Sequence, residues 1–227
     1  NVLGLAGHRG HVVFGAHATQ ALNTALMGTL EAGDVLVVTD FDHNAVVRPA
    51  AALARAGVVV RCVPGRPDGS LDQVALERAL DGATLLTINA ASNVLGTRLP
   101  VADVAHLARE AGARVLVDTA QSAGHVVDDL AEVDLVAVTG HKGLLGPQGV
   151  GALWIREGVE VRPLLHGGTG GDSRSPDMPT ALPDRLEAGT LNGPGISGLL
   201  TGIQWVEARG IRAMHEAATP LKQRLHD

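Results

Sequence analysis

Short apolar segments alternate with stretches of helical periodicity along this chain, and that alternation restricts its fold more than any other feature. Most of the expected strands are continuously apolar, as Val115-Leu-Val117 is, instead of alternating polar with apolar residues. Continuous apolar strands are typical of a parallel or mostly parallel sheet that helices cover on both faces. The expected strands cover residues 11–15, 35–39, 58–63, 84–88, 114–118, 135–138 and 150–155.

Helical periodicity fills the intervals between these strands. We expect the first strand to be buried, Ser70 to cap one helix, and Pro100 to occupy the first position of another. The expected helices cover residues 16–30, 45–56, 71–80, 100–111, 194–208 and 211–226, and a long glycine- and proline-rich loop spans 167–183. The sequence therefore predicts an α/β fold, a three-layer αβα sandwich with a mostly parallel central sheet, as one domain over residues 1–227.

Composition excludes several classes of function. A net charge of −6 and an aromatic content of 2% argue against a nucleic-acid surface, which needs basic patches and stacking rings. The single cysteine, Cys62, excludes an internal disulfide and a multi-cysteine zinc site. No apolar run has the length of a membrane helix, and no signal peptide is visible. We expect a soluble cytoplasmic protein with no nucleic-acid or membrane partner.

Polar side chains gather where the expected strands end. In parallel sheets, ligands bind at the carboxyl ends of the strands. Each of these residues has an ordinary explanation as a helix cap or turn former, but their common position at one sheet edge indicates a binding site. They are Ala18 and Thr19 at a helix start, Asp42-His43-Asn44, Asn93, Asp118 with Gln121, and Thr139 with His141 and Lys142.

Lys142 is the most informative of them, because only two of the 18 Lys and Arg residues are lysines, Lys142 and Lys222. A lysine amine can lose its proton and attack a carbonyl, which a guanidinium cannot do. A helix start offers free N–H groups to a phosphate, and a carboxylate such as Asp118 suits a protonated ring nitrogen. Pyridoxal phosphate offers a protein three groups to bind, namely its phosphate, its pyridinium nitrogen and its aldehyde. The ordinary alternative for Lys142 is a surface lysine in a glycine-rich turn.

Four segments resemble the class V aminotransferases, which are fold-type I pyridoxal-phosphate enzymes, and especially their cysteine desulfurase-like branch. The resemblance covers about residues 12–206 and implies the large domain of that family. It also implies pyridoxal 5'-phosphate as cofactor, a small amino acid as substrate, and a homodimer with shared active sites. The segments are Ala91-Ser-Asn-Val-Leu-Gly-Thr97, Val117-Asp-Thr-Ala-Gln-Ser-Ala-Gly124, Thr139-Gly-His-Lys-Gly-Leu-Leu-Gly-Pro-Gln-Gly-Val-Gly151 and Glu187-Ala-Gly-Thr-Leu-Asn192.

The resemblance assigns a role to each matching residue. Lys142 would be the catalytic Schiff-base lysine, Asp118 would pair with the pyridine nitrogen, and Gln121 would bind the phenolic oxygen. Asn93 would contact the substrate carboxylate, and Thr190 would reach the phosphate held by the neighbouring subunit. The phosphate of its own subunit would be held by Ala18, Thr19, Thr139 and His141.

The sequence departs from the family pattern at three places. A histidine that usually stacks on the cofactor ring is Ala90 here, and we expect the side chain of Asn89 to point elsewhere if the segment is extended. Cys62 lies in an expected strand, so we expect a small buried hydrophobe and not a nucleophile. The family's N-terminal segment and its C-terminal small domain, with an arginine for the substrate carboxylate, have no counterpart in residues 1–227, so we expect a large domain alone.

These departures leave the reaction open between transamination, lyase and desulfurase chemistry, and they leave the amino acid open as well. A second hypothesis is a cofactor-binding or dimerisation module that has lost catalysis. A nicotinamide site is disfavoured because no G-x-G-x-x-G follows the first strand. A metal-dependent hydrolase is a third hypothesis, but we predict no metal site, because no zinc pattern matches the spacing of its candidates, His8, His11, His17, Asp40, Asp42 and His43.

Overall fold

The computed structural model describes residues 2–171 and 174–226, and its centre is one seven-stranded sheet. The strand order is β1-β7-β6-β5-β4-β2-β3, with β2 to β6 parallel and β7 antiparallel to both β6 and β1. The predicted mostly parallel sheet is confirmed. The strands are β1 (Gly10–Gly15), β2 (Val35–Thr39), β3 (Val59–Val63), β4 (Leu85–Asn89), β5 (Arg114–Asp118), β6 (Leu135–Thr139) and β7 (Gly151–Arg156).

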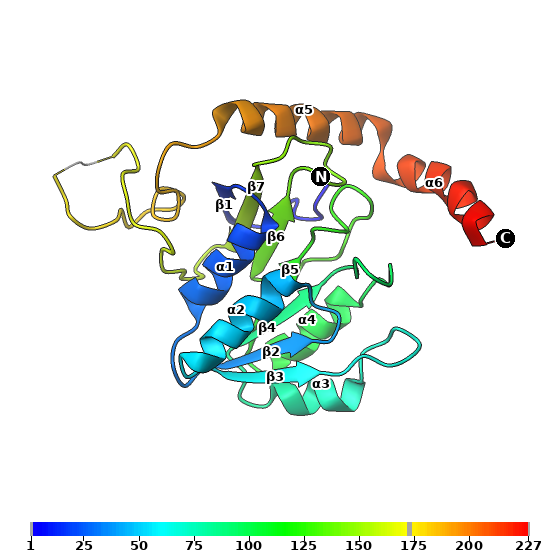
Figure 1. Ribbon diagram of the computed structural model, residues 1–227, viewed down its shortest axis with the longest axis horizontal. Coiled ribbons are helices and arrows are strands. Elements are labelled where there is room, and N and C mark those ends of the chain that lie inside the picture. Colours follow the sequence, from blue (N-terminus) through cyan, green and yellow to red (C-terminus); the bar gives the residue numbers. More distant parts are fainter. Residues whose placement is uncertain (1, 172–173, 227) are drawn as a thin grey trace.

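Helices cover both faces of this sheet, as Figure 1 shows, so the three-layer α/β prediction is confirmed. None of the helices in the described ranges combines the length and the apolar character needed to cross a membrane. Part of the long loop expected at 167–183, residues 172–173, lies outside the described residues. The helices are α1 (Ala18–Thr29), α2 (Asn44–Arg55), α3 (Gln73–Leu80), α4 (Val101–Glu110), α5 (Gly193–Arg209) and α6 (Ile211–His226).

Two hydrophobic cores lie on opposite faces of the sheet, and β6 contributes to both. Leu135 and Ala137 pack into the core under α1 and α2, whereas Val136 and Val138 pack into the core that includes residues of α3, α4 and α5. Successive side chains of a strand point to opposite faces, so a strand covered on both sides must be apolar throughout. This requirement explains the continuous apolar runs.

Three local expectations were wrong. The first strand, β1, is an edge strand whose residues 10–12 are exposed, because it pairs only with β7. Helix α3 begins at Gln73, and its cap is Asp72, whose Oδ1 accepts the Ala75 N–H at 2.9 Å; Ser70 instead donates to Asp68. Pro100 is the N-cap of α4 and not its first residue, since its carbonyl accepts the first helical hydrogen bond, from Val104.

Candidate active site

A cleft of about 270 Å³ opens at the carboxyl edge of the sheet, where β2, β4, β5 and β6 end. The sequence placed its candidate residues at this edge, and the fold brings nearly all of them together. Those that line the cleft are Ala18, Thr19, Asn93, Asp118, Gln121, Thr139, His141 and Lys142. Seven further residues complete its lining: His17, Leu22, His43, Ala45, Asn89, Ala91 and Ala120.

Asp118 lies at the end of β5 and is 6% exposed. Its Oδ1 accepts the Ala120 N–H at 2.9 Å, and no hydrogen bond to Oδ2 occurs among the described residues. Burial raises the pKa of this carboxyl, while the Ala120 N–H and the positive charge of Lys142 act in the opposite direction. The carboxylate therefore needs a cationic neighbour, and the free Oδ2 is available to one.

The loop after β6 brings Lys142 close enough for its charge to act on Asp118. This loop packs against the segment after β5 through two glycines. A Cβ on Gly143 would overlap the carbonyl oxygen of Ala123, and a Cβ on Gly124 would overlap that of Gly143. Larger residues at either position would separate the two loops, so the glycines fix the amine near the carboxylate.

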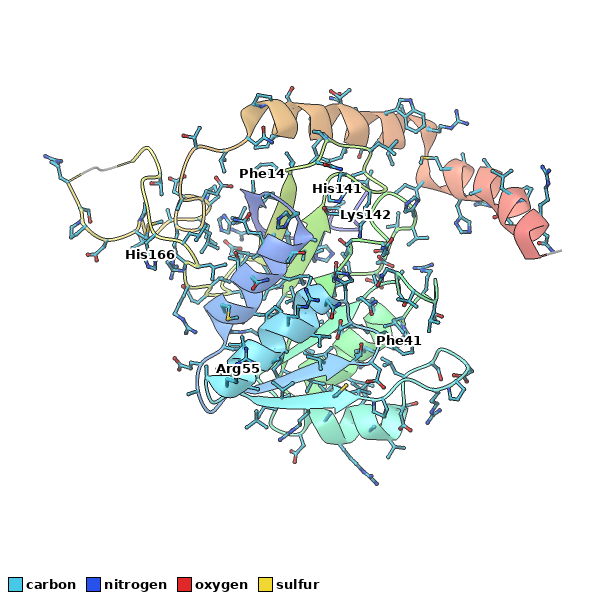
Figure 2. All side chains as sticks on the ribbon, in the orientation of Figure 1. Phe14, Phe41, Arg55, His141, Lys142 and His166 are labelled. Carbon is cyan, nitrogen blue, oxygen red and sulfur yellow. The ribbon has the colours of Figure 1, made fainter. Side chains whose placement is uncertain are left out.

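The side chain of Lys142 is exposed and makes no hydrogen bond or ion pair within the described chain. Figure 2 labels it beside His141, in the region between the end of β6 and α5. The Oγ1 of Thr139 lies 3.2 Å from Nδ1 of His141, which joins the end of β6 to this loop. The amine is thus free to react with a carbonyl group that enters the cleft.

Helix α1 presents its N-terminus to the same cleft. His17 caps the helix, with its Nδ1 accepting the Gln20 N–H at 3.1 Å. The backbone N–H groups of Ala18 and Thr19 have no acceptor among the described residues. Free N–H groups at a helix start, together with the helix dipole, form a binding site for a phosphate.

These features fit the three groups of pyridoxal phosphate that a protein can bind. The phosphate suits the N-terminus of α1, the ring nitrogen suits Oδ2 of Asp118, and the aldehyde suits Lys142. A buried carboxylate with a free oxygen and a helix start with free donors are both unfavourable unless a ligand or water satisfies them. The residues present therefore fit the group that the sequence predicted.

Asn89 was predicted wrongly. Its side chain lines the cleft, because β4 ends at this residue and its Nδ2 donates to the carbonyl oxygens of Phe41 (2.8 Å) and Ala91 (3.1 Å). Ala90, at the usual ring-stacking position, is fully buried and does not line the cleft, whereas Ala91 does. The alternation of an extended segment explains both facts, since Asn89 and Ala91 share one side.

Sequence reasoning gave no cofactor role to His17 or His43, yet both line the cleft. Each is the N-cap of the helix that follows a strand, α1 or α2, with its Nδ1 accepting a backbone N–H of that helix. A histidine placed between a strand end and a helix start was the signal that could have identified them.

Thr190 lies outside the cleft. It borders a neighbouring hollow of about 220 Å³ whose lining includes Gln20 and Glu187. Within a single chain it is therefore not brought to the cofactor residues, and its assignment to a neighbouring subunit stays a prediction.

Cys62 is exposed, so the expected burial was wrong; it lies on β3, an edge strand of the sheet. Its Sγ–H donates to Oδ1 of Asp40 at 3.2 Å. Partial burial, that hydrogen bond and the negative charges of Asp40 and Asp42 raise the pKa of the thiol to about 11. The group is a neutral thiol near pH 7 and does not line the cleft, so it is a poor nucleophile.

The described residues contain no group of three or more His, Cys, Asp and Glu side chains arranged to hold a metal ion.

Comparison with known proteins agrees with the geometry. The family model described as aminotransferase class-V matches residues 5–227. A probable cysteine desulfurase of Pyrococcus abyssi is 33% identical over 94% of this chain and 56% of its own length. A cysteine desulfurase of Salmonella choleraesuis is 38% identical over 88% of this chain and 52% of its own length.

Solved structures give the same result. The apo cysteine desulfurase of Thermococcus onnurineus superposes with a TM-score of 0.85 at 32% identity, covering 94% of this chain and 56% of that one. A cysteine desulfurase of Escherichia coli gives a TM-score of 0.80 at 29% identity, covering 89% and 53%. The chain spans about half the length of the relatives that it matches.

Proposed function

The chain belongs to the class V aminotransferase family, and we propose that it binds pyridoxal 5'-phosphate in the cleft and acts on a small amino acid. One observation carries the proposal: the buried carboxyl of Asp118, the unpaired amine of Lys142 and the free N-terminus of α1 line a single cleft. When bound, the cofactor would supply an electron sink for the amino acid's carbanion.

Two residues do the central work in this proposal. Asp118 keeps the cofactor's ring nitrogen protonated, because a buried carboxylate is stabilised by a cationic partner at its free Oδ2. Lys142 would hold the cofactor at its aldehyde, and the same amine, once freed, would take the α-proton of the substrate as a general base. Its lack of a competing ion pair among the described residues leaves it available for both tasks.

Other residues position the ligands. The N–H groups of Ala18 and Thr19, with Thr139 and His141, bind the phosphate, and Gln121 binds the phenolic oxygen. Asn93 contacts the substrate carboxylate from the loop after β4.

We propose candidate substrates from the names of the relatives, and the residues that line the cleft restrict the choice of reaction. Cysteine is a candidate because similar proteins are named cysteine desulfurases. Desulfuration needs a thiolate to attack the substrate's sulfur, and no cysteine lines the cleft within the described residues. Alanine and serine, which need no thiolate, are therefore tested beside cysteine.

The experiment supplies the purified, cofactor-loaded chain with cysteine, alanine and serine in separate reactions. Sulfide, keto acid and ammonia are measured for each, with Lys142→Ala as the control. We expect one amino acid to yield product at a rate that Lys142→Ala lowers by about 10²- to 10⁴-fold, the range for loss of a general base. Equal rates in both proteins would exclude the proposed role of Lys142.

A second candidate function is a cofactor-binding module without turnover. It is favoured by the absence of an arginine from the described lining of the cleft, since an arginine fork is the usual partner of a substrate carboxylate. This candidate predicts a bound cofactor whose absorbance does not change when any amino acid is added. A spectral change on addition of an amino acid favours the enzyme instead.

We also propose a homodimer in which Thr190 serves the partner's site. Its place in the hollow next to the cleft, beside Glu187 and not beside Lys142, supports that arrangement. Mixing Thr190→Ala with Lys142→Ala protein should restore activity in mixed dimers, because one of their two sites then has both residues intact. Failure of the mixture to exceed either parent would contradict shared sites.

A further inference from the structure

Asp42 is a buried carboxyl that the proposed reaction does not use. It lies three residues after the end of β2 and is 9% exposed. Its Oδ2 accepts hydrogen bonds from the N–H (2.7 Å) and the Oγ1 (3.2 Å) of Thr39. Its Oδ1 is buried and has no partner among the described residues. An ionised carboxyl with one wholly unsatisfied oxygen is unfavourable in the interior of a protein.

A second carboxyl, that of Asp118, lies close enough to act on Asp42 electrostatically. The strand between them is β4, which ends at Asn89; this residue pairs with Asp118 in the sheet and donates from Nδ2 to the carbonyl oxygen of Phe41, the neighbour of Asp42. The Oδ1 of Asn89 is also buried and without a donor in the described chain. The carboxyl of Asp118 and the residue Asn89 thus line the cleft, and the strand that ends at Asn89 separates Asp118 from the buried carboxyl of Asp42.

We propose that in mildly acidic solution Asp42 holds a proton while Asp118 is ionised, so that the two carboxyls carry a single negative charge until Asp42 loses its proton. Loss of the proton from Asp42 then adds a second negative charge near Asp118. The effect on the cofactor rests on the proposed function, whereas the protonation of Asp42 does not.

The surroundings determine which carboxyl keeps the proton. Asp118 accepts the Ala120 N–H and faces the positive charge of Lys142, and both favour its ionised form. Burial and the negative charge of Asp118 raise the pKa of Asp42 to about 7, against the opposing effects of the hydrogen bonds from Thr39 and of the backbone of Asn89. Cys62 on β3 also lies within electrostatic reach of Asp42, and it is a neutral thiol at this pH.

The consequence is a pH-dependent field at the cofactor. Below about pH 7, one carboxylate stabilises the protonated ring nitrogen; above it, two do. Ionisation of Asp42 should therefore extend the protonated forms of the ring nitrogen and of the cofactor-linked Lys142 nitrogen to higher pH. An asparagine at position 42 removes this contribution without a large change of volume.

The first test is infrared difference spectroscopy on the cofactor-free protein. The wild type should show the C=O stretching band of a buried protonated carboxylic acid at pH 6 that disappears as the pH rises through about 7. Asp42→Asn should lack this band, and Asp40→Asn, which changes an exposed carboxyl two residues away, should keep it. In Asp118→Asn the carboxyl of Asp42 should lose its proton, and the band should disappear, at lower pH than in the wild type, because the negative charge of Asp118 has been removed.

Three outcomes would overturn the proposal: no such band at pH 6 in the wild type, a band that survives in Asp42→Asn, or a band that is missing from Asp118→Asn at every pH between 6 and the ordinary carboxyl range. The wild-type and Asp118→Asn measurements decide the matter even if Asp42→Asn does not fold.

The second test follows the absorbance of bound pyridoxal phosphate against pH, where Asp42→Asn should lower the pH midpoint of the spectral change. A protein that shows the band but binds no cofactor would contradict the proposed function alone, and an unchanged midpoint would overturn the link between Asp42 and the cofactor.

Discussion

Gly151, the first residue of β7, tests whether the N-terminus of α1 is held in a position that binds phosphate. A Cβ built there would lie 2.6 Å from the carbonyl oxygen of Val138, and 2.7 Å and 2.8 Å from Cα and C of His17. Ordinary contacts begin at 3.4 Å, so atoms would have to move by about 0.6 to 0.8 Å. All three obstructing atoms belong to the backbone, so no side-chain rotation can relieve the overlap.

Gly151→Ala should therefore shift the start of α1 away from β7. Overpacking of this kind lowers the free energy of unfolding by about 1 to 3 kcal/mol. For a chain of this length the melting temperature should fall by about 2 to 12 °C. Because His17 directly precedes Ala18 and Thr19, the same shift should weaken binding of pyridoxal phosphate more than binding of pyridoxal, which lacks the phosphate.

The assays are urea unfolding of the cofactor-free protein and titration with each of the two ligands. Gly193→Ala is the matched control, because a Cβ at that helix start meets nothing within 4 Å. We expect the control to match the wild type in both assays. A Gly151→Ala protein with wild-type stability and an unchanged ratio of the two affinities would refute the proposed role of this contact.

Three further predictions follow from the charges of the site. Asp118→Asn should still bind pyridoxal phosphate, but in single-turnover absorbance experiments it should react with amino acids at least about tenfold more slowly. The loss of even about 1.4 kcal/mol of ring-nitrogen stabilisation gives that factor. An unchanged rate would contradict the pairing of Asp118 with the ring nitrogen. Because the pKa of Asp42 is raised to about 7, the contribution of this residue to folding stability is fully present below the ordinary carboxyl range and is lost as the pH rises toward about 7. Urea unfolding should therefore show Asp42→Asn gaining stability relative to the wild type across that interval, by up to about 4 kcal/mol. Parallel pH profiles of the two proteins would contradict this. Cys62→Ala should leave product formation unchanged, and the wild-type thiol should react slowly with a disulfide reagent at pH 8 despite its exposure, because its pKa is about 11; rapid modification would contradict this.

The sheet and its edge were predictable because they follow from local periodicity. Leu135 to Val138 are apolar at every position, which only a strand covered on both faces requires, and Asp118 and Thr139 follow from the rule that ligands bind where parallel strands end. Prediction succeeded where a residue's environment depends on its own segment.

The errors concern residues whose environment depends on a distant partner. The exposure of Cys62 follows from the position of β3 at the sheet edge, and the exposure of β1 follows from its pairing with β7 alone. The orientation of Asn89 depends on the residue at which β4 ends. Thr190 lies in a segment without strand or helix periodicity, so its spatial position could not be read from the sequence. The proximity of Asp42 to Asp118 likewise required the strand order.

The central claim, that Lys142 holds the cofactor, can be tested directly because the chain has only two lysines, Lys142 and Lys222. The protein is incubated with pyridoxal phosphate, reduced with borohydride to fix any Schiff base, and digested for peptide mass mapping. We predict one stoichiometric pyridoxyl modification on the peptide that contains Lys142, and its loss in Lys142→Arg. Modification of Lys222 at an equal or higher level, or a Lys142 peptide without modification, would contradict the account.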